Sequence, residues 1–455
     1  MKTRLAIALA ALCASGLGAH ADSDLDNIPT ASTQQPADAL PARYNIYVQS
    51  DLTLSAPRGA LVVPLASPPS WDARLFADAR LQWQLGSDLT FSYSGRLNLR
   101  AEEGLAFPSH ETIRHDLREA YLSWQAGGVV FVQLGRINLK SGVALGFNPT
   151  DFFKTRAVVE PLSADPTVLR EDRLGTVMLL GQAVWAGASL MLALAPKLAR
   201  DTPPYANDAL RNFDPMFDRT NARGRALVKM SVDLFDDVSP ELLAYAEDGR
   251  IRFGLNLTKG FGQAVVAYLE WAGGTRPSLA DDAFEDGVRA GVLPSVPPLP
   301  VGARRGFSHD LAVGASYATA LGITFNLEYD YHQAGFSGTD WRNWFAGGSS
   351  GDPDLPGELW FLRGYAGDQQ EPVARQSLFL RADWPHAVYT NLALTGFVDT
   401  DLRDGSGLAQ VTADYYLSPQ WTVGGLADIY YGGRRSDFGS LPQSVNVLAK
   451  VTRYF

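Results

Sequence analysis

The sequence has 455 residues, a formal net charge of −10 and one cysteine. An acidic chain is a poor match for the phosphates of nucleic acid, and a single cysteine forms no intramolecular disulfide. The mean hydropathy is −0.08, although many short segments are apolar. Membrane-spanning helices would raise that average, whereas strands that alternate apolar and polar residues keep it near zero.

The first residues predict export from the cytoplasm. Residues 1–21 combine a basic start at Lys2 and Arg4, a short apolar run at 5–12 and an Ala-His-Ala cleavage site, which are the three parts of a signal peptide. The apolar run is too short to span a bilayer. Residues 22–43 are rich in Asp, Pro, Ser, Thr and Gln, and they predict a flexible periplasmic lead-in.

From residue 44 to residue 455, apolar and polar residues alternate in segments of ~10 residues, the length of a tilted membrane-spanning strand. In the segment 74–85, Leu75 and Ala77 share one face. Arg74 and Asp78 share the opposite face, whereas a helix would scatter all four around its axis. The predicted strands, about eighteen within two, are 44–54, 74–85, 88–100, 114–124, 129–140, 174–185, 188–196, 223–235, 240–247, 250–258, 263–272, 307–318, 323–335, 375–384, 387–399, 407–417, 421–431 and 444–455.

The connections alternate in length. Every second connection is short: 86–87, 126–128, 186–187, 236–239, 259–262, 321–322, 385–386 and 418–420. The others are mostly long: 55–73, 101–113, 141–173, 197–222, 273–306, 336–374, 400–406 and 432–443, with 248–249 as the exception. This alternation predicts an all-β, single, antiparallel up-and-down barrel with short periplasmic turns and long extracellular loops. A propeller or a sandwich predicts no such alternation.

The stretch 174–196 has a rival interpretation. It contains no charged residue and is long enough for a membrane-spanning helix. We favour a hairpin that turns at 185–187, because a spanning helix would tend to leave the protein in the inner membrane. Both faces of this hairpin are apolar, so Met178, Leu180 and Val184 would face an apolar sector of the lumen or a plug.

The last segment, 444–455, alternates valines and alanine with mostly polar residues and ends on Phe455. It resembles the closing strand of bacterial outer-membrane β-barrel proteins, which ends in Phe and is read by the assembly machinery. Arg453 departs from the pattern because it falls on the apolar face, where a charge costs little at the aqueous rim. The alternative is an ordinary edge strand. The resemblance implies an outer-membrane location in a Gram-negative bacterium, membrane lipids and the barrel-assembly machinery as partners, and Phe455 as the assembly signal.

The charged residues on the polar faces predict the lining of a pore. Basic residues concentrate on early strands and acidic ones on late strands, so opposite walls would carry opposite charge and create a transverse field. The alternative is that the charges pair with one another and fill the lumen. The predicted pore-lining residues are Arg74, Arg80, Arg96, Arg100, Arg225, Lys229, Glu270, Glu328, Asp330, His332, Asp414 and Asp428.

The segment 135–153 joins a strand to a loop dotted with glycines and an Asn-Pro-Thr-Asp turn. It loosely resembles a segment of outer-membrane proteins of the alginate-export or lipid-export-associated sort, in which such a loop can fold into the barrel. Arg136, Lys140 and Asp151 would then tether the loop to the wall through charge-assisted hydrogen bonds. The alternative is a surface loop with a structural Asn-Pro turn.

Other motifs carry little chemistry. Residues 347–351 match G-x-S-x-G, but a nucleophile elbow needs a strand before it and a helix after it, and we expect a loop here. The acidic clusters at 281–286 and 352–358 lack the spacing of a calcium loop, so we expect solvated charge. The sequence therefore predicts no catalytic residue, no metal site and no cofactor.

The functional prediction is an outer-membrane channel for passive diffusion or export of a small or polymeric solute. One alternative is transport of hydrophobic molecules or lipids, suggested by the apolar inner face at 178–184. Another is a non-transporting surface scaffold. Expected partners are a small-molecule, polysaccharide or lipid solute, with homo-oligomers or an envelope export complex left open. Residues 22–43 are too few for a folded plug, so energy-coupled uptake is not expected.

Overall fold

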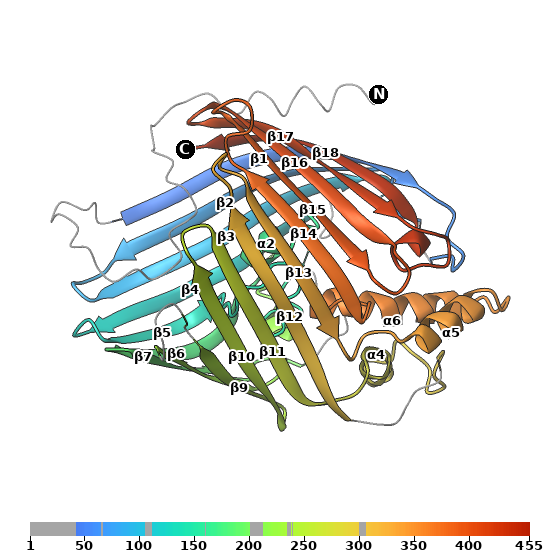
Figure 1. Cartoon of the computed structure of the whole chain (residues 1–455), viewed down its shortest axis with the longest axis horizontal. Coiled ribbons are helices and arrows are strands. Elements are labelled where there is room, and N and C mark those ends of the chain that lie inside the picture. Colours follow the sequence, from blue (N-terminus) through green and yellow to red (C-terminus); the bar gives the residue numbers. More distant parts are fainter. Residues whose placement is uncertain are drawn as a thin grey trace.

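The computed structural model describes residues 42–64, 67–104, 112–159, 161–200, 213–233, 238, 240–299 and 306–455. The predicted signal peptide and all but the end of the lead-in lie outside these residues. In the described part, eighteen strands form one antiparallel sheet in which each strand pairs with its neighbours in the sequence. β1 (Ala42–Pro57) also pairs with β18 (Gln443–Tyr454), so the sheet closes into a barrel (Figure 1). The predicted fold and strand number are confirmed.

The strand bounds lie within a few residues of the predicted ones for most strands. β5 is shorter than predicted, because the chain leaves the wall after Ile137. The remaining strands are β2 (Trp71–Gln84), β3 (Leu89–Glu102), β4 (Ile113–Ala126), β5 (Val130–Ile137), β6 (Thr176–Trp185), β7 (Ala188–Ala195), β8 (Arg225–Val232), β9 (Glu241–Glu247), β10 (Arg250–Phe261), β11 (Val265–Arg276), β12 (Gly306–Ala318), β13 (Thr324–His332), β14 (Gln376–Trp384), β15 (Leu392–Asp401), β16 (Gly407–Ser418) and β17 (Trp421–Tyr431).

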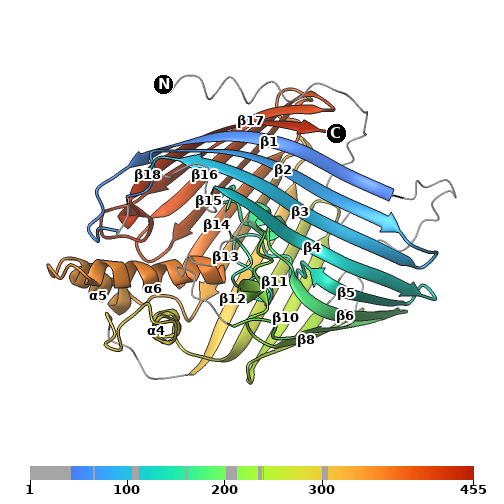
Figure 2. The ribbon, with the colours of Figure 1, turned by 180° about the vertical axis from the view of Figure 1, so that it is seen from behind.

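The two faces of the wall differ as the alternation predicts. Leu134 and Val411 are 58% and 60% exposed on the outer face, where apolar side chains suit lipid. Asp78 and Glu328 are 0% exposed on the inner face. The stretch 174–196 is the hairpin β6–β7, turning at Gly187, so the helical alternative is excluded. Figure 2 shows the interior from the other side, with chain between β5 and β6 lying inside the barrel.

Helices in the connections were not predicted. They are α2 (Pro166–Glu171), α3 (Phe217–Thr220), α4 (Leu279–Arg289), α5 (Gly338–Gly348), α6 (Leu355–Gln369) and the short 3-10 helix η3 (Phe438–Ser440). Ser278 caps α4, and a reciprocal capping box formed by Ser337 and Asp340 starts α5. No helix in the described part of the chain is long and apolar enough to cross a bilayer.

α4, α5 and α6 form a helical cap at the end of the barrel that carries the long connections (Figure 1). Trp341, Trp344 and Leu359 form its buried core, together with Val62 from the β1–β2 connection. We call this the long-loop end, and the opposite end, where β1 begins and β18 finishes, the short-turn end. Each helix is too short to be stable alone, so this shared core explains why helices persist here.

The helices change the interpretation of two motifs. Gly347 and Gly348 end α5, so a helix precedes the G-x-S-x-G match where an elbow needs a strand. The prediction of solvated charge at 281–286 is wrong in part. Asp281 is buried, Asp282 contacts Arg250 at 3.4 Å and Asp286 contacts Arg223 at 3.2 Å. Packing of α4 beside these arginines withdraws the carboxylates from solvent.

The contacts of the closing strand explain why Arg453 is tolerated on its apolar face. The Phe455 amide donates to Ile46 O at 3.0 Å, which extends the β18–β1 seam to the last residue. The Arg453 guanidinium lies 5.4 Å from the Trp421 ring centroid and 4.7 Å from that of Phe455. A cation over aromatic faces at the barrel rim is stabilised there, so Arg453 does not disturb the apolar face.

Deleting Phe455 should lower the yield of folded, heat-modifiable barrel in the outer membrane, because the seam loses its last hydrogen bond and the predicted assembly signal. The measurement is the electrophoretic shift between unheated and boiled samples of the membrane fraction. Phe213→Ala is the control, since Phe213 is 73% exposed and lies in a connection at the long-loop end. An unchanged shift and yield after deletion would refute the assembly role.

Candidate functional site

The connection between β5 and β6, residues 138–175, folds into the barrel and crosses it. We call it the crossing loop. On one side it contacts β3 and β4, where Asp172 meets Arg96 at 2.9 Å and Arg118 at 3.1 Å. On the other side it contacts β14, where Asp165 meets Arg381 at 2.6 Å. These strands lie on opposite sides of the closed sheet, so the loop spans the interior. The inward-folded interpretation of the segment 135–153 thus matches the structure, and the surface-loop alternative does not.

Two glutamates of the wall hold the loop by its backbone. Glu270 of β11 accepts hydrogen bonds from the amides of Val143 and Ala144, the latter at 2.6 Å. Glu328 of β13 accepts from the amides of residues 145, 146 and 147 at 2.8–2.9 Å. Five consecutive amides that converge on carboxyl groups form an anion-binding nest. We call Glu270 and Glu328 the carboxylate clamp.

The clamp is buried and its remaining acceptor sites are used. Both glutamates are 0% exposed. Thr150 donates its hydroxyl to Glu270 at 3.1 Å, and Tyr268 donates to Glu328 at 2.8 Å. A buried carboxyl group is stable only when it is hydrogen-bonded in this way. The loop therefore supplies the hydrogen-bond donors that the buried glutamates need, and the glutamates supply the acceptors that the buried amides need.

Two glycines allow this close approach. Gly142 has a φ of +76°, and a Cβ there would lie 2.3 Å from the Glu270 carboxyl group. A Cβ on Gly146 would lie 2.7 Å from Cγ of Phe379 in β14. Any side chain at either position would push the loop off the wall. The glycine-dotted pattern in the sequence is explained by these two contacts.

A second set of ion pairs holds the end of the loop. Arg96 and Arg118 both bind Asp78 of β2, at 3.0 Å and 2.6 Å, in addition to Asp172. The Asp165 carboxylate binds Arg381 through both oxygens. Nearby, the Ser163 hydroxyl donates to Gln410 of β16 at 2.9 Å. The crossing loop is therefore anchored to the wall on several sides.

Of the three predicted tether residues, Arg136 connects the loop to the wall, whereas Lys140 and Asp151 bind partners within the loop. Lys140 pairs with Glu171, and Asp151 pairs with Arg173 at 2.8 Å, both within the loop. Arg136 donates to Gly175 O at 2.8 Å and to Pro215 O. Lys140 and Asp151 therefore brace the loop internally, Arg136 joins its exit to β5, and the clamp and the arginine pairs join it to the other strands.

Lys154 is one of the buried cations of the crossing loop, together with Arg156 and Arg173. Lys154 donates to Asn148 O at 2.7 Å, and its ammonium lies 4.3 Å from the Phe147 ring centroid. Burial lowers the pKa of Lys154 to about 8, although Glu371 and Asp151 oppose that shift. The Asn-Pro turn at 148–149 is thus held from inside the loop.

Most of the predicted pore-lining residues are paired with another side chain of the wall, and the others have different surroundings. Several are paired with a neighbour on the same wall: Arg74 and Arg100 with Asp72 (2.8 and 2.5 Å), Arg96 with Asp78, Lys229 with Glu241 (3.0 Å), Asp414 with Lys450 (2.9 Å), His332 with Asp310 (2.8 Å), and Asp428 with Gln410 (2.7 Å). Arg225 lies 5.7 Å from the Phe153 ring centroid. Arg80 lines a cavity at the short-turn end. One oxygen of Asp330, Oδ1, has no hydrogen-bond partner among the described residues.

This arrangement agrees with the alternative in which the charges pair with one another, and the transverse field stays a prediction. The sequence reasoning omitted the acidic partners on the early strands, such as Asp72 and Asp78. Asp78 stands directly opposite Arg96 in the β2–β3 register. The alternation of apolar and polar residues already placed Asp78 and Arg96 on inward faces of their strands. That they form a pair can be seen only once the β2–β3 register is known.

Replacing both clamp residues, Glu270→Gln with Glu328→Gln, should loosen the crossing loop. Each glutamine turns one acceptor into an amide donor that faces other donors. Hydrogen exchange at the amides of residues 143–147 should accelerate about tenfold or more. The reason is that a buried amide that loses its acceptor loses about 1–3 kcal/mol of stabilisation against local opening. Glu241→Gln is the control, because Glu241 binds Lys229 and Asn256 away from the loop. Unchanged exchange in a folded double variant would show that the clamp does not hold the loop.

Comparison with known proteins supports the fold. No family model matches the chain, and no curated protein is significantly similar in sequence. Among solved structures, Pseudomonas aeruginosa OccK11 (OpdR) matches with a TM-score of 0.50 at 12% identity, covering 91% of this chain and 96% of that chain. A mutant of the Rhodopseudomonas blastica porin matches with a TM-score of 0.41 at 12% identity, covering 91% and 100%. At such identities the likeness shows fold alone: the chain forms a closed, porin-like β-barrel of eighteen strands.

Proposed function

We propose that the protein is a channel in the outer membrane of a Gram-negative bacterium, through which small solutes diffuse. The observation that carries the proposal is a closed barrel of eighteen strands whose interior is crossed by one anchored loop. A barrel of this size is wide enough for an aqueous passage unless its interior is filled. The crossing loop then sets the aperture. The proposal involves no catalytic step.

In the proposed orientation in the membrane, the short-turn end faces the periplasm and the helical cap faces the outside of the cell. Long connections on the outer side are typical of such barrels. The exposed apolar outer wall contacts lipid, and the assembly machinery reads the end of β18. Association with further copies of the chain is compatible with this wall.

Single cysteines can test the orientation, because the only natural cysteine lies in the predicted signal peptide. Cysteines at Val296 and Asp354, both exposed near the helical cap, should react with an impermeant maleimide in intact cells. Cysteines at Ser87, Gly322 and Gln420 in the short turns should react only after lysis. The reverse pattern would invert the orientation.

Planar bilayers can separate a channel from a scaffold. Purified wild-type protein should show discrete conductance steps, and the clamp double variant should show larger or noisier steps because the crossing loop moves. Glu241→Gln should match the wild type. If a barrel lacking most of the crossing loop folds and still conducts no current, the scaffold alternative replaces the channel.

Ion selectivity tests the predicted field. Arg80→Gln should shift the reversal potential in a salt gradient toward cations, and Asp330→Asn should shift it toward anions. Asp330 is preferred to Glu328 here, because Glu328 also holds the loop. Both shifts should shrink with salt, since the Debye length falls from about 10 Å at 0.1 M to about 3 Å at 1 M. A conducting channel that neither change affects would exclude these residues from the constriction.

Transport of hydrophobic molecules is supported less directly. The apolar inner face of β6 is largely covered, because Met178 and Leu180 pack in one cluster with Phe152 and Phe153 of the crossing loop. This contact accounts for the apolar sector that the sequence predicted. Val184 and Met191 extend this apolar sector toward the short-turn end, where they line a cavity.

A further inference from the structure

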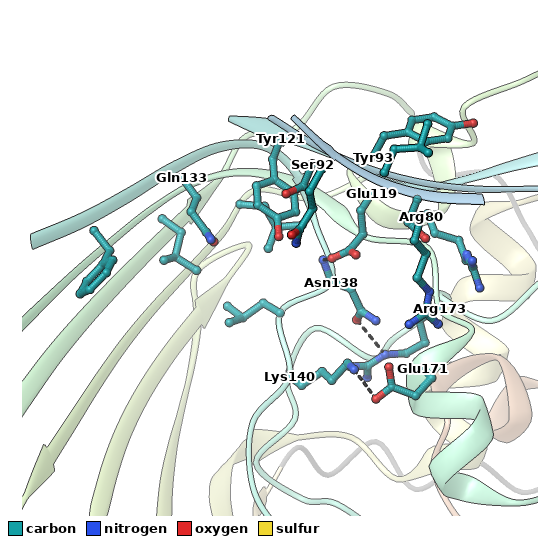
Figure 3. Close-up of a pocket in the computed structure, with 18 of the residues that line it drawn as sticks. Arg80, Ser92, Tyr93, Glu119, Tyr121, Gln133, Asn138, Lys140, Glu171 and Arg173 are labelled. Atoms are coloured by element: carbon teal, nitrogen blue, oxygen red, sulfur yellow. Dashed lines mark hydrogen bonds and ion pairs between the residues drawn. The ribbon is translucent and has the colours of Figure 1, made fainter. Parts of the chain in front are cut away.

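A cavity of about 670 Å³ lies below the crossing loop on the side of the short-turn end. Its walls are the inner ends of β1 to β7, and its roof consists of residues 138–140, Glu171 and Arg173 of the loop (Figure 3). Sites for small organic ligands have volumes of about 300–1,000 Å³, so one such molecule fits here. Binding of a ligand in this cavity, inside the barrel, rests on the proposed channel function.

Cationic groups dominate one side of the cavity. Arg43, Arg80 and Arg118 come from β1, β2 and β4, and Lys140 and Arg173 come from the roof. The acidic lining residues are Glu119 and Glu171. Figure 3 shows Arg80, Lys140 and Arg173 around the same space, with Glu171 beside Lys140. The lining therefore has more positive than negative groups, which favours an anion.

Hydrogen bonds fix part of this charged side. Lys140 pairs with Glu171, and Arg173 donates to Asn138 at 3.3 Å and to Asp151 at 2.8 Å. Arg118 is held by Asp78 at 2.6 Å. Glu119 accepts the Asn138 amide at 3.0 Å, so its charge is also committed to the roof. A ligand would thus meet cations that are already oriented, which lowers the entropic cost of binding.

The other side of the cavity is apolar. Phe131 of β5, Leu180 and Val184 of β6, and Met191 of β7 line it. The polar lining residues from these three strands are Gln133 and Gln182, and no charged residue of β5–β7 in the described chain lines the cavity. Apolar wall in a hydrated lumen is unfavourable until an apolar group covers it. This side therefore selects for a ligand with a hydrocarbon or aromatic body.

We propose that the cavity is a binding site for a small amphiphilic organic anion, a carboxylate on an apolar body. The carboxylate lies toward Arg80 and Lys140, and the body lies against Leu180 and Met191. A simple anion would use the cationic side alone, and a neutral lipid would leave it unused. An amphiphilic acid uses both sides, and it rests against the crossing loop that sets the aperture.

The test measures equilibrium binding to full-length protein in lipid nanodiscs by titration calorimetry. The probe is octanoate, compared with octanol, acetate and octylammonium. Octanoate should bind saturably, and each of the other three should bind about tenfold more weakly or worse, because each lacks the apolar body or the negative charge. Octanol or octylammonium binding as tightly as octanoate would overturn the proposal.

Variants locate the site. Arg80→Gln and the double change Leu180→Asn with Met191→Gln should each weaken octanoate binding about tenfold. Arg434→Gln is the control, because Arg434 contacts Gly59 O at the long-loop end. Heat modifiability reports whether each variant is folded. If both site variants fold and bind octanoate like the wild type, the proposal is wrong.

Conductance on the same preparation separates the two proposals. Octanoate binding without conductance would support the site and refute the channel. Conductance without saturable octanoate binding would support the channel and refute the site.

Discussion

The interior of this barrel depends on the hydrogen bonds from five consecutive amides, residues 143–147, to Glu270 and Glu328. Two buried glutamates without hydrogen-bond donors would be costly, and so would five buried amides without acceptors. Together they satisfy one another. Gly142 and Gly146 let the backbone approach the wall closely enough to form these bonds. The glycines of the loop and the glutamates of the wall therefore determine together where the loop lies.

The opposite side of the interior is held differently. Arg96, Arg118, Asp78 and Asp172 form a compact cluster in which each arginine meets both carboxylates. Removing one member would leave a buried charge without its partner, which is far more destabilising than the pair is stabilising. Between this cluster and the carboxylate clamp, the crossing loop has little freedom to swing. The position of the loop is therefore determined by contacts on both sides of the wall.

The helical cap adds a third fixed element at the long-loop end. Arg363 of α6 binds Asp437, beside η3, at 2.6 Å, and its guanidinium lies 5.2 Å from the Trp360 ring centroid. The ion pair connects the cap to the β17–β18 connection, while the tryptophans pack it internally. Together with Val62 from the β1–β2 connection, these contacts join segments from both ends of the sequence. The cap is thus joined to the β1–β2 and β17–β18 connections at the long-loop end.

The sequence by itself determined the barrel. Alternation with a period of two is local, so it located the strands, and the alternation of connection lengths set their up-and-down order. The pattern of the last strand, which ends on Phe455, could likewise be read from adjacent residues. Tertiary structure decided the rest, because the decisive contacts join residues far apart in the chain. Glu270 was predicted to line the pore, but its binding of the Val143 amide depends on a loop 127 residues away. The helical cap was missed because its short helices are stabilised by a shared core. Asp78 was on the predicted inner face, yet only the β2–β3 register places it opposite Arg96 and makes it an anchor.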